Sequence, residues 1–169
     1  MSEGSKAPIW ILVAIGGCGC LVALTAIAGV IAALVIPNLV DATGRAKQAR
    51  TVADLRNVGV AWESWLVDRG GDDVARELPV GTMAPERLSD LLTPVHATAV
   101  PTVDGWGHPL EYAILPSESL ERPRLQIRSP GRDGVFEPPP ERDTAFTARD
   151  FDRDLVWRDG RLVQYPAPR

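Results

Sequence analysis

The chain has 169 residues, a length typical of a single domain. Its formal net charge is −4, which excludes the strongly basic composition that nucleic-acid-binding proteins use. Its only cysteines, Cys18 and Cys20, both lie in an apolar segment near the N-terminus. The rest of the sequence therefore offers neither a disulfide nor a cysteine-based metal site.

An uncharged apolar run extends over residues 9–36, and Thr25 is its one clearly polar residue. About 20 apolar residues in a helix are enough to cross the core of a bilayer. The run therefore predicts a transmembrane helix that follows a short N-terminal segment, residues 1–8. Two processed forms are alternatives: a signal peptide cleaved near residues 26–28, or a lipoprotein acylated at Cys18. The length of the run favours the uncleaved helix.

The helix is predicted to continue over residues 37–69. Apolar residues recur there at three- and four-residue spacing, at Val52, Leu55, Val58, Trp62, Trp65 and Leu66. That spacing predicts an amphipathic helix that lays one stripe on a core. Pro37 removes a backbone donor and is expected to kink the helix. Gly70 and Gly71 form a stop signal after it.

The second half of the chain changes to short apolar runs separated by Pro and Gly. Four strands are predicted, at residues 110–115, 124–129, 154–158 and 161–165. Asp159 and Gly160, between the last two strands, favour a two-residue type I′ hairpin turn. Pro85 to Leu92 is expected to form a short helix. The predicted fold class is α+β: residues 70–169 form a domain with a small antiparallel β-sheet, and the long N-terminal helix packs on that sheet.

A long connection, residues 130–153, joins the second and third predicted strands. It carries three consecutive prolines, residues 138–140, and many acidic side chains. Structureless loops of that length are uncommon in compact domains unless they bind something or are disordered. The connection is therefore the best candidate for a functional site.

Several stretches, taken in order, make the sequence resemble the type II secretion pseudopilins, particularly the major pseudopilin, within the type IV pilin-like family. They are the apolar helix with its Pro-Asn step at residues 27–39, the Asp-Gly-Trp-Gly-His-Pro segment at 104–109 with Tyr112, the Ser-Pro-Gly-Arg-Asp-Gly turn at 129–134, and the acidic stretch at 152–155. With the Ala/Arg/Lys-rich helix continuation to about Arg69, which is also similar to the family, they span most of the chain. The resemblance implies a pilin-like fold.

The resemblance also implies a function. It points to a structural subunit of a type II secretion pseudopilus or a related filament, in contact with membrane lipid and with other pilin-like subunits as a homo-oligomer. The anchor would make a single pass through a bacterial inner membrane, with residues 1–8 in the cytoplasm and the C-terminal domain in the periplasm. Basic residues after the apolar run, Arg45, Lys47 and Arg50, oppose that orientation by the positive-inside rule.

One departure from the family leaves a second function open. Family members carry a Gly-Phe processing site for prepilin peptidase and a Glu early in the helix, whereas this sequence has no Phe before Phe136 and no acid between Glu3 and Asp41. The alternative is a stand-alone membrane-anchored periplasmic binding module with a pilin-like fold. Gly29, Ala33 and Pro37 are the candidate helix-packing residues, since small residues four apart let helices approach closely.

The resemblance further implies a calcium site in the long connection, formed by Asp133, Asp152 and Asp154. Calcium prefers six to eight oxygen ligands from carboxylates, carbonyls and water. The alternative is a solvated acidic loop in which arginines pair with the carboxylates. Glu137 lies outside the positions that match the family, so its removal is expected to change the stabilisation by calcium little.

The two histidines, His96 and His108, belong to no recognisable nucleophilic or metal-ligand pattern. The sequence also contains no phosphate-binding loop and no nucleophile elbow. An enzyme with a small-molecule substrate is therefore not expected.

Overall fold

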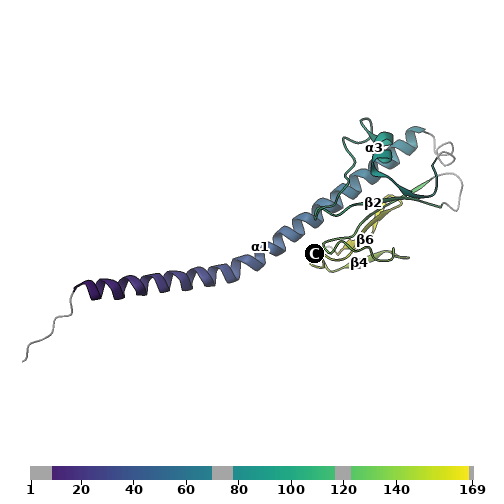
Figure 1. Ribbon diagram of the computed structural model, residues 1–169. Coiled ribbons are helices and arrows are strands. Elements are labelled where there is room, and N and C mark those ends of the chain that lie inside the picture. Colours follow the sequence, from purple (N-terminus) through teal and green to yellow (C-terminus); the bar gives the residue numbers. More distant parts are fainter. Residues whose placement is uncertain (1–8, 70–77, 117–122, 168–169) are drawn as a thin grey trace, which may run out of the picture. The chain divides into compact units, whose positions relative to one another are not determined.

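The computed structural model describes residues 9–69, 78–116 and 123–167 (Figure 1). Its first element is a long helix, α1 (Ile9–Arg69). The predicted apolar helix and its continuation are thus one element, and the helix passes through Pro37 without ending. The expected stop at Gly70 lies outside the described residues. Contacts between residues divide the chain into two units, Met1–Ala42 and Thr43–Arg169.

In the first unit, the side chains that the structure describes begin at Leu24 and form an apolar, exposed helix surface. The large apolar side chains from Leu24 to Val40 are all at least 53% exposed, with no core of their own to cover them. The helix is long and apolar enough to cross a membrane, which agrees with the expected anchor.

The second unit adds a six-stranded sheet and one short helix. These elements are β1 (Gly81–Met83), α3 (Pro85–Leu92), β2 (Glu111–Leu115), β3 (Arg124–Ser129), β4 (Thr144–Phe146), β5 (Leu155–Arg158) and β6 (Arg161–Pro166). The strand order in the sheet is β1-β2-β3-β5-β6-β4. Every neighbouring pair is antiparallel except β4 and β6, which are parallel.

The four predicted strands and the predicted short helix are confirmed to within one residue at each end. The hairpin turn is confirmed as well, because Asp159 and Gly160 both have positive φ, 53° and 77°, as a type I′ turn requires. A wholly antiparallel sheet was a wrong expectation. The connection between β3 and β5 contains a strand, β4, that runs beside β6 in the same direction. Strands β1 and β4 are only three residues long and lie at the edges.

The core lies between the second half of α1 and one face of the sheet. The predicted helix stripe is buried there: Leu55, Val58, Trp62, Trp65 and Leu66 are at most 4% exposed, and Val52 packs partly buried against them. Gly59 allows the closest approach, because a Cβ at that position would collide with the indole of Trp157 on β5.

The opposite face of the sheet is polar and yet buried. Side chains alternate between faces along a strand, so β3 turns Leu125 and Ile127 toward the core and Gln126 and Arg128 away from it. Gln126 and Arg128 are nevertheless only 5% and 7% exposed. Residues 130–143, named the strap here, cover this face between β3 and β4.

Candidate functional site

The Gly-rich segment after Asp104 is organised by that carboxylate, which is 2% exposed. Its Oδ1 atom accepts hydrogen bonds from the backbone N–H groups of Trp106 and His108, both at 2.9 Å. Its Oδ2 atom accepts from the hydroxyl of Ser129 at 2.7 Å. Two stretches 25 residues apart, each singled out in the sequence, are therefore joined by one buried carboxylate.

The same segment is also attached to α1. The Thr51 hydroxyl, which donates to the carbonyl of Lys47 at 3.0 Å, accepts from the N–H of Gly105 at 2.9 Å. A side chain at position 105 would meet the Lys47 backbone, so only glycine permits this contact. Helix α1, the 104–109 segment and the end of β3 are held together at this point.

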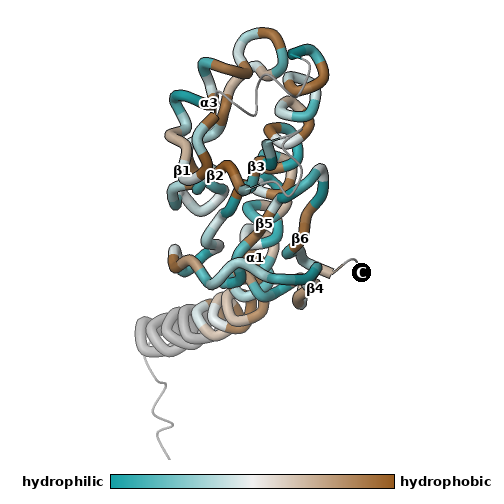
Figure 2. Tube along the Cα trace, turned by 90° about the vertical axis from the view of Figure 1, so that its right-hand side faces the viewer, coloured by the Kyte–Doolittle hydropathy of each residue, from teal (hydrophilic) through white to brown (hydrophobic). Residues whose placement is uncertain are grey.

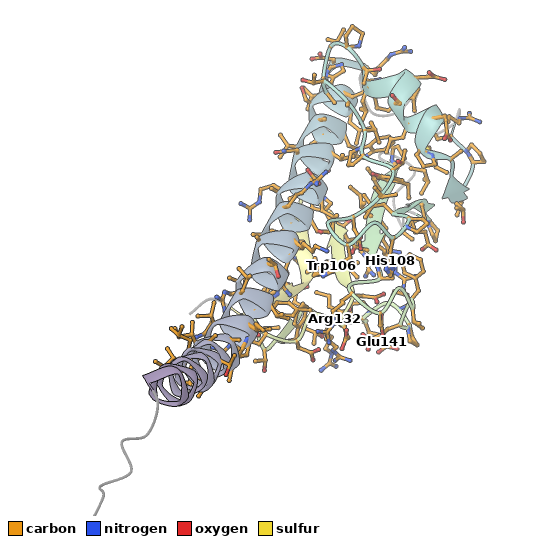
Figure 3. The ribbon with its side chains drawn as sticks, turned by 60° about the vertical axis from the view of Figure 1, so that its left-hand side comes forward. Trp106, His108, Arg132 and Glu141 are labelled. Atoms are coloured by element: carbon orange, nitrogen blue, oxygen red, sulfur yellow. The ribbon has the colours of Figure 1, made fainter. Side chains whose placement is uncertain are left out.

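The turn that follows β3 packs against two other loops. Gly131 has a φ of 74°, and a Cβ there would lie 2.8 Å from the carbonyl oxygens of Phe151 and Arg153. Gly134 lies against the ring of His108. Figure 3 shows Trp106 and His108 on one loop, with Arg132 and Glu141 on the neighbouring strap. His108 is therefore a packing residue of this loop cluster.

A buried ion pair fixes the strap to the sheet. The guanidinium of Arg128 on β3 contacts Asp154 Oδ2 at 2.9 Å and Glu111 Oε1 on β2 at 3.2 Å. It also donates to the carbonyl of Glu137 and lies 4.8 Å from the ring centroid of Phe136. Asp154 is 1% exposed, and burial raises its pKa despite the opposing effect of Arg128.

Glu137 is the strap residue with the most polar contacts among those described. Its N–H donates to Asp154 Oδ2 at 3.1 Å, and its carbonyl accepts from Arg128. Its carboxylate accepts from Arg153 Nη1 at 2.7 Å and from Gln164 Nε2 at 3.2 Å. These contacts attach the strap to the sheet, whereas the small effect of Glu137 on calcium binding stays a prediction. The sequence carries no signal for these contacts, because the alternation of Gln126 and Arg128 with apolar residues is also what a strand with one solvated face shows.

The three predicted calcium ligands have other partners. Asp152 forms a bidentate pair with Arg132, both distances being 2.7 Å, and that pair lowers the pKa of Asp152. Asp133 Oδ1 accepts from the N–H of Val135 at 3.0 Å, whereas Asp154 is held by Arg128. Within the described ranges, no group of three or more His, Cys, Asp or Glu side chains is placed to hold a metal ion. The calcium site stays a prediction, and it requires Arg132 to leave Asp152.

The three predicted helix-packing residues lie in the first unit, and each of them is exposed. A Cβ added at Gly29 would meet nothing within 4 Å, and Ala33 and Pro37 are exposed. Their surface is therefore available to another helix or to lipid.

Searches with this chain found no matching protein-family model, no matching curated protein and no matching solved structure.

Proposed function

We propose that the chain is a pilin-like structural subunit of a type II secretion pseudopilus or a related filament. Its apolar helix would anchor it in a bacterial inner membrane, with the domain on the periplasmic side. The function is assembly: copies pack side by side through α1. The resemblance of the four sequence stretches supports this proposal, and so does the way in which two of them meet at Asp104 and Ser129.

The main structural support for this proposal is the exposed face of α1 within the second unit. Ala46, Ala53, Val60 and Val67 are spaced seven residues apart and are all exposed. Seven residues are nearly two helical turns, so these four residues lie on one side of α1. That side faces away from the buried stripe. Apolar residues that repeat every seven positions are the pattern by which helices pack against one another. Val60 and Val67 are 58% and 67% exposed, so their side chains can contact another copy of the chain.

Cysteine cross-linking in membranes tests this proposal. In a full chain with Cys18 and Cys20 replaced by serine, Val60→Cys and Val67→Cys are expected to give cross-linked oligomers. Val80→Cys is the matched control, since Val80 is an equally exposed valine, 63%, away from α1. Oligomers at positions 60 and 67 but not at 80 support packing through α1. If all three variants give only monomers, the proposal of a filament subunit is wrong and the stand-alone anchored module takes its place.

Orientation is tested separately. A reporter enzyme that is active only in the cytoplasm, fused after Arg169, is expected to be inactive. Activity would place the domain in the cytoplasm, the side that Arg45, Lys47 and Arg50 favour.

A further inference from the structure

A groove of about 440 Å³ lies between α1 and the segment that follows α3. That segment runs beside the second half of α1 (Figures 1 and 2). Both elements contribute apolar side chains to the lining, namely Val58, Val60, Ala61, Ala97, Ala99 and Pro101. Val60 also belongs to the exposed seven-residue repeat of α1, so the groove continues the surface through which copies are proposed to pack.

The groove carries one positive charge that is not balanced. Arg56 is exposed and forms no hydrogen bond or ion pair among the described residues. The carboxylate in the lining, Asp54, is paired with Arg50 at 3.6 Å, one turn away on α1. His96, the other titratable group of the lining, lies 3.8 Å from Asp68. A partner that fits this groove therefore brings a carboxylate together with an apolar side chain.

The turn at the start of the strap offers both groups. This turn, residues 131–135, is named the tip here. Val135 is 63% exposed, and Asp133 is an exposed carboxylate two residues before it. Asp133 accepts the N–H of Val135 at 3.0 Å. The adjacent Arg132, labelled in Figure 3, forms its ion pair with Asp152, so Asp133 has no ion pair within the part of the chain that the structure describes.

The other exposed large apolar side chains of the second unit outside α1 do not offer this combination. The acid beside Val103 is buried, and the acid beside Phe136 is paired with Arg153. No described acid lies within four residues of Val80 or Val95. The tip is therefore the segment whose chemistry matches the groove.

We propose that the groove of one copy receives the tip of a neighbouring copy. Asp133 of the neighbouring copy pairs with Arg56, and its Val135 packs on the apolar wall beside Ala97 and Ala99. Attraction between a patch of one charge and a patch of the other fixes the register of such a contact. The proposal rests on the assembly of copies in the proposed function and adds the segment that each copy presents to the next.

The places of the tip and the groove make this contact a filament contact. They are different surfaces of one chain, so each copy can donate one tip and receive another. Arg132 of the tip lies 5.9 Å from the ring centroid of Phe151, which packs on Gly44 of α1. The groove begins ten residues further along α1, at Asp54, and ten residues of helix span about 15 Å. Copies with parallel α1 helices are thus shifted along α1, and a repeated shift gives an open filament instead of a ring.

Cross-linking in membranes that contain the full chain tests the docking. Cys18 and Cys20 are replaced by serine, and Ala99→Cys in the groove is combined with Val135→Cys at the tip, both exposed positions. A short bismaleimide is expected to give a ladder of oligomers, because each copy carries both ends of the contact. One cysteine per copy can link at most two copies, so neither single variant can give a ladder. Ala99→Cys with Val80→Cys is the matched control, since Val80 and Val135 are both 63% exposed.

Charge variants of the double-cysteine chain test the ion pair. Arg56→Glu is expected to reduce the ladder at least fivefold, because like charges then meet, whereas Arg56→Lys is expected to keep it. Arg56→Glu together with Asp133→Arg exchanges the charges and is expected to restore the ladder. Arg87→Glu, at an exposed arginine of α3 with no polar contact among the described residues, is the control and is expected to change nothing. Thermal melting of each variant verifies that the domain remains folded.

Other results would overturn the docking. A ladder that persists in a folded Arg56→Glu protein, or one that forms equally well with Val80→Cys, would show that the tip and the groove do not recognise each other. Cross-linking of Val67→Cys with no ladder from the groove and tip cysteines would refute the docking and leave assembly through α1. Monomers in every variant, those at Val60 and Val67 included, would refute the proposed function as well.

Discussion

The carboxylate of Asp104 accepts a hydrogen bond from the hydroxyl of Ser129, with 2.7 Å between the two oxygens. Both residues are buried, at most 2% exposed. Ser129→Ala is expected to leave Asp104 Oδ2 buried without that donor. Loss of such a partner costs about 1–3 kcal/mol, so chemical denaturation should show a lower free energy of unfolding by about that amount. Thr82→Ala, an exposed hydroxyl at the β1 edge, is the control and is expected to change little. Equal effects of both changes would show that the bond contributes nothing specific.

Gly59 tests the contact between α1 and the sheet. Alanine normally stabilises a helix interior by about 1 kcal/mol relative to glycine, so helix propensity alone predicts a more stable protein. Here the added Cβ would collide with the Trp157 indole, and Gly59→Ala is expected to lower the melting temperature. Gly29→Ala, at a helix position where nothing lies within 4 Å, is expected to leave the melting of the domain unchanged. A stabilised Gly59→Ala protein would contradict the close packing.

The strap should depend on Glu137. Glu137→Ala removes the acceptor for Arg153 and Gln164 and is expected to destabilise the domain by about 1–2 kcal/mol, the range for a pair of partly buried hydrogen bonds. Glu141→Ala is the matched control, because Glu141 is an exposed strap glutamate with no polar contact among the described residues. Limited proteolysis of the strap should accelerate in the first variant alone. Equal proteolysis of both would show that the strap does not need this residue.

Two neighbouring acids should respond to pH in opposite directions. The Arg132 hydrogen bonds lower the pKa of Asp152 in the folded state, so Asp152 contributes stability above its ordinary pKa of 3.8 that is lost as the pH falls through the folded value. Burial raises the pKa of Asp154, so its favourable contribution is present below 3.8 and is lost as the pH rises through the raised value.

Denaturation of the wild type and of two variants across the acid range tests these signs. The stability difference between wild type and Asp152→Asn should grow as the pH rises, whereas the difference between wild type and Asp154→Asn should shrink. Differences that change in the same direction would mean that Arg128 outweighs burial at Asp154.

Calcium binding should be limited by Arg132. If Asp133 and Asp152 can serve as ligands, the guanidinium competes with the ion for Asp152. Arg132→Gln is therefore expected to show a larger calcium-dependent rise in melting temperature than the wild type, and Arg149→Gln, another exposed arginine nearby in sequence, to behave like the wild type. Identical melting in calcium, magnesium and chelator for every variant would remove the metal site.

The sequence predicts the elements of this fold better than it predicts the contacts of its loops. Periodicity reveals α1 and the four longer strands, because each buries a regular stripe or alternates between faces. It cannot reveal β4, since three residues are too few to establish a period, and so the parallel pairing with β6 was missed. The sequence left a metal site and arginine pairing as alternatives for the acidic loop, because it shows the charged residues but not which arginine meets which carboxylate. Arg128 contacts Asp154 across 26 residues.

The place of β6 has a consequence for biosynthesis. This strand is the last element that the structure describes, yet in the sheet it lies inside, between β5 and β4. A nascent chain that has not yet delivered residues 161–166 cannot complete the sheet, and β4 has no partner until they arrive. The sheet is therefore expected to close only after residues 161–166 have been made, so that β3 and β5 pair before β4 finds its place.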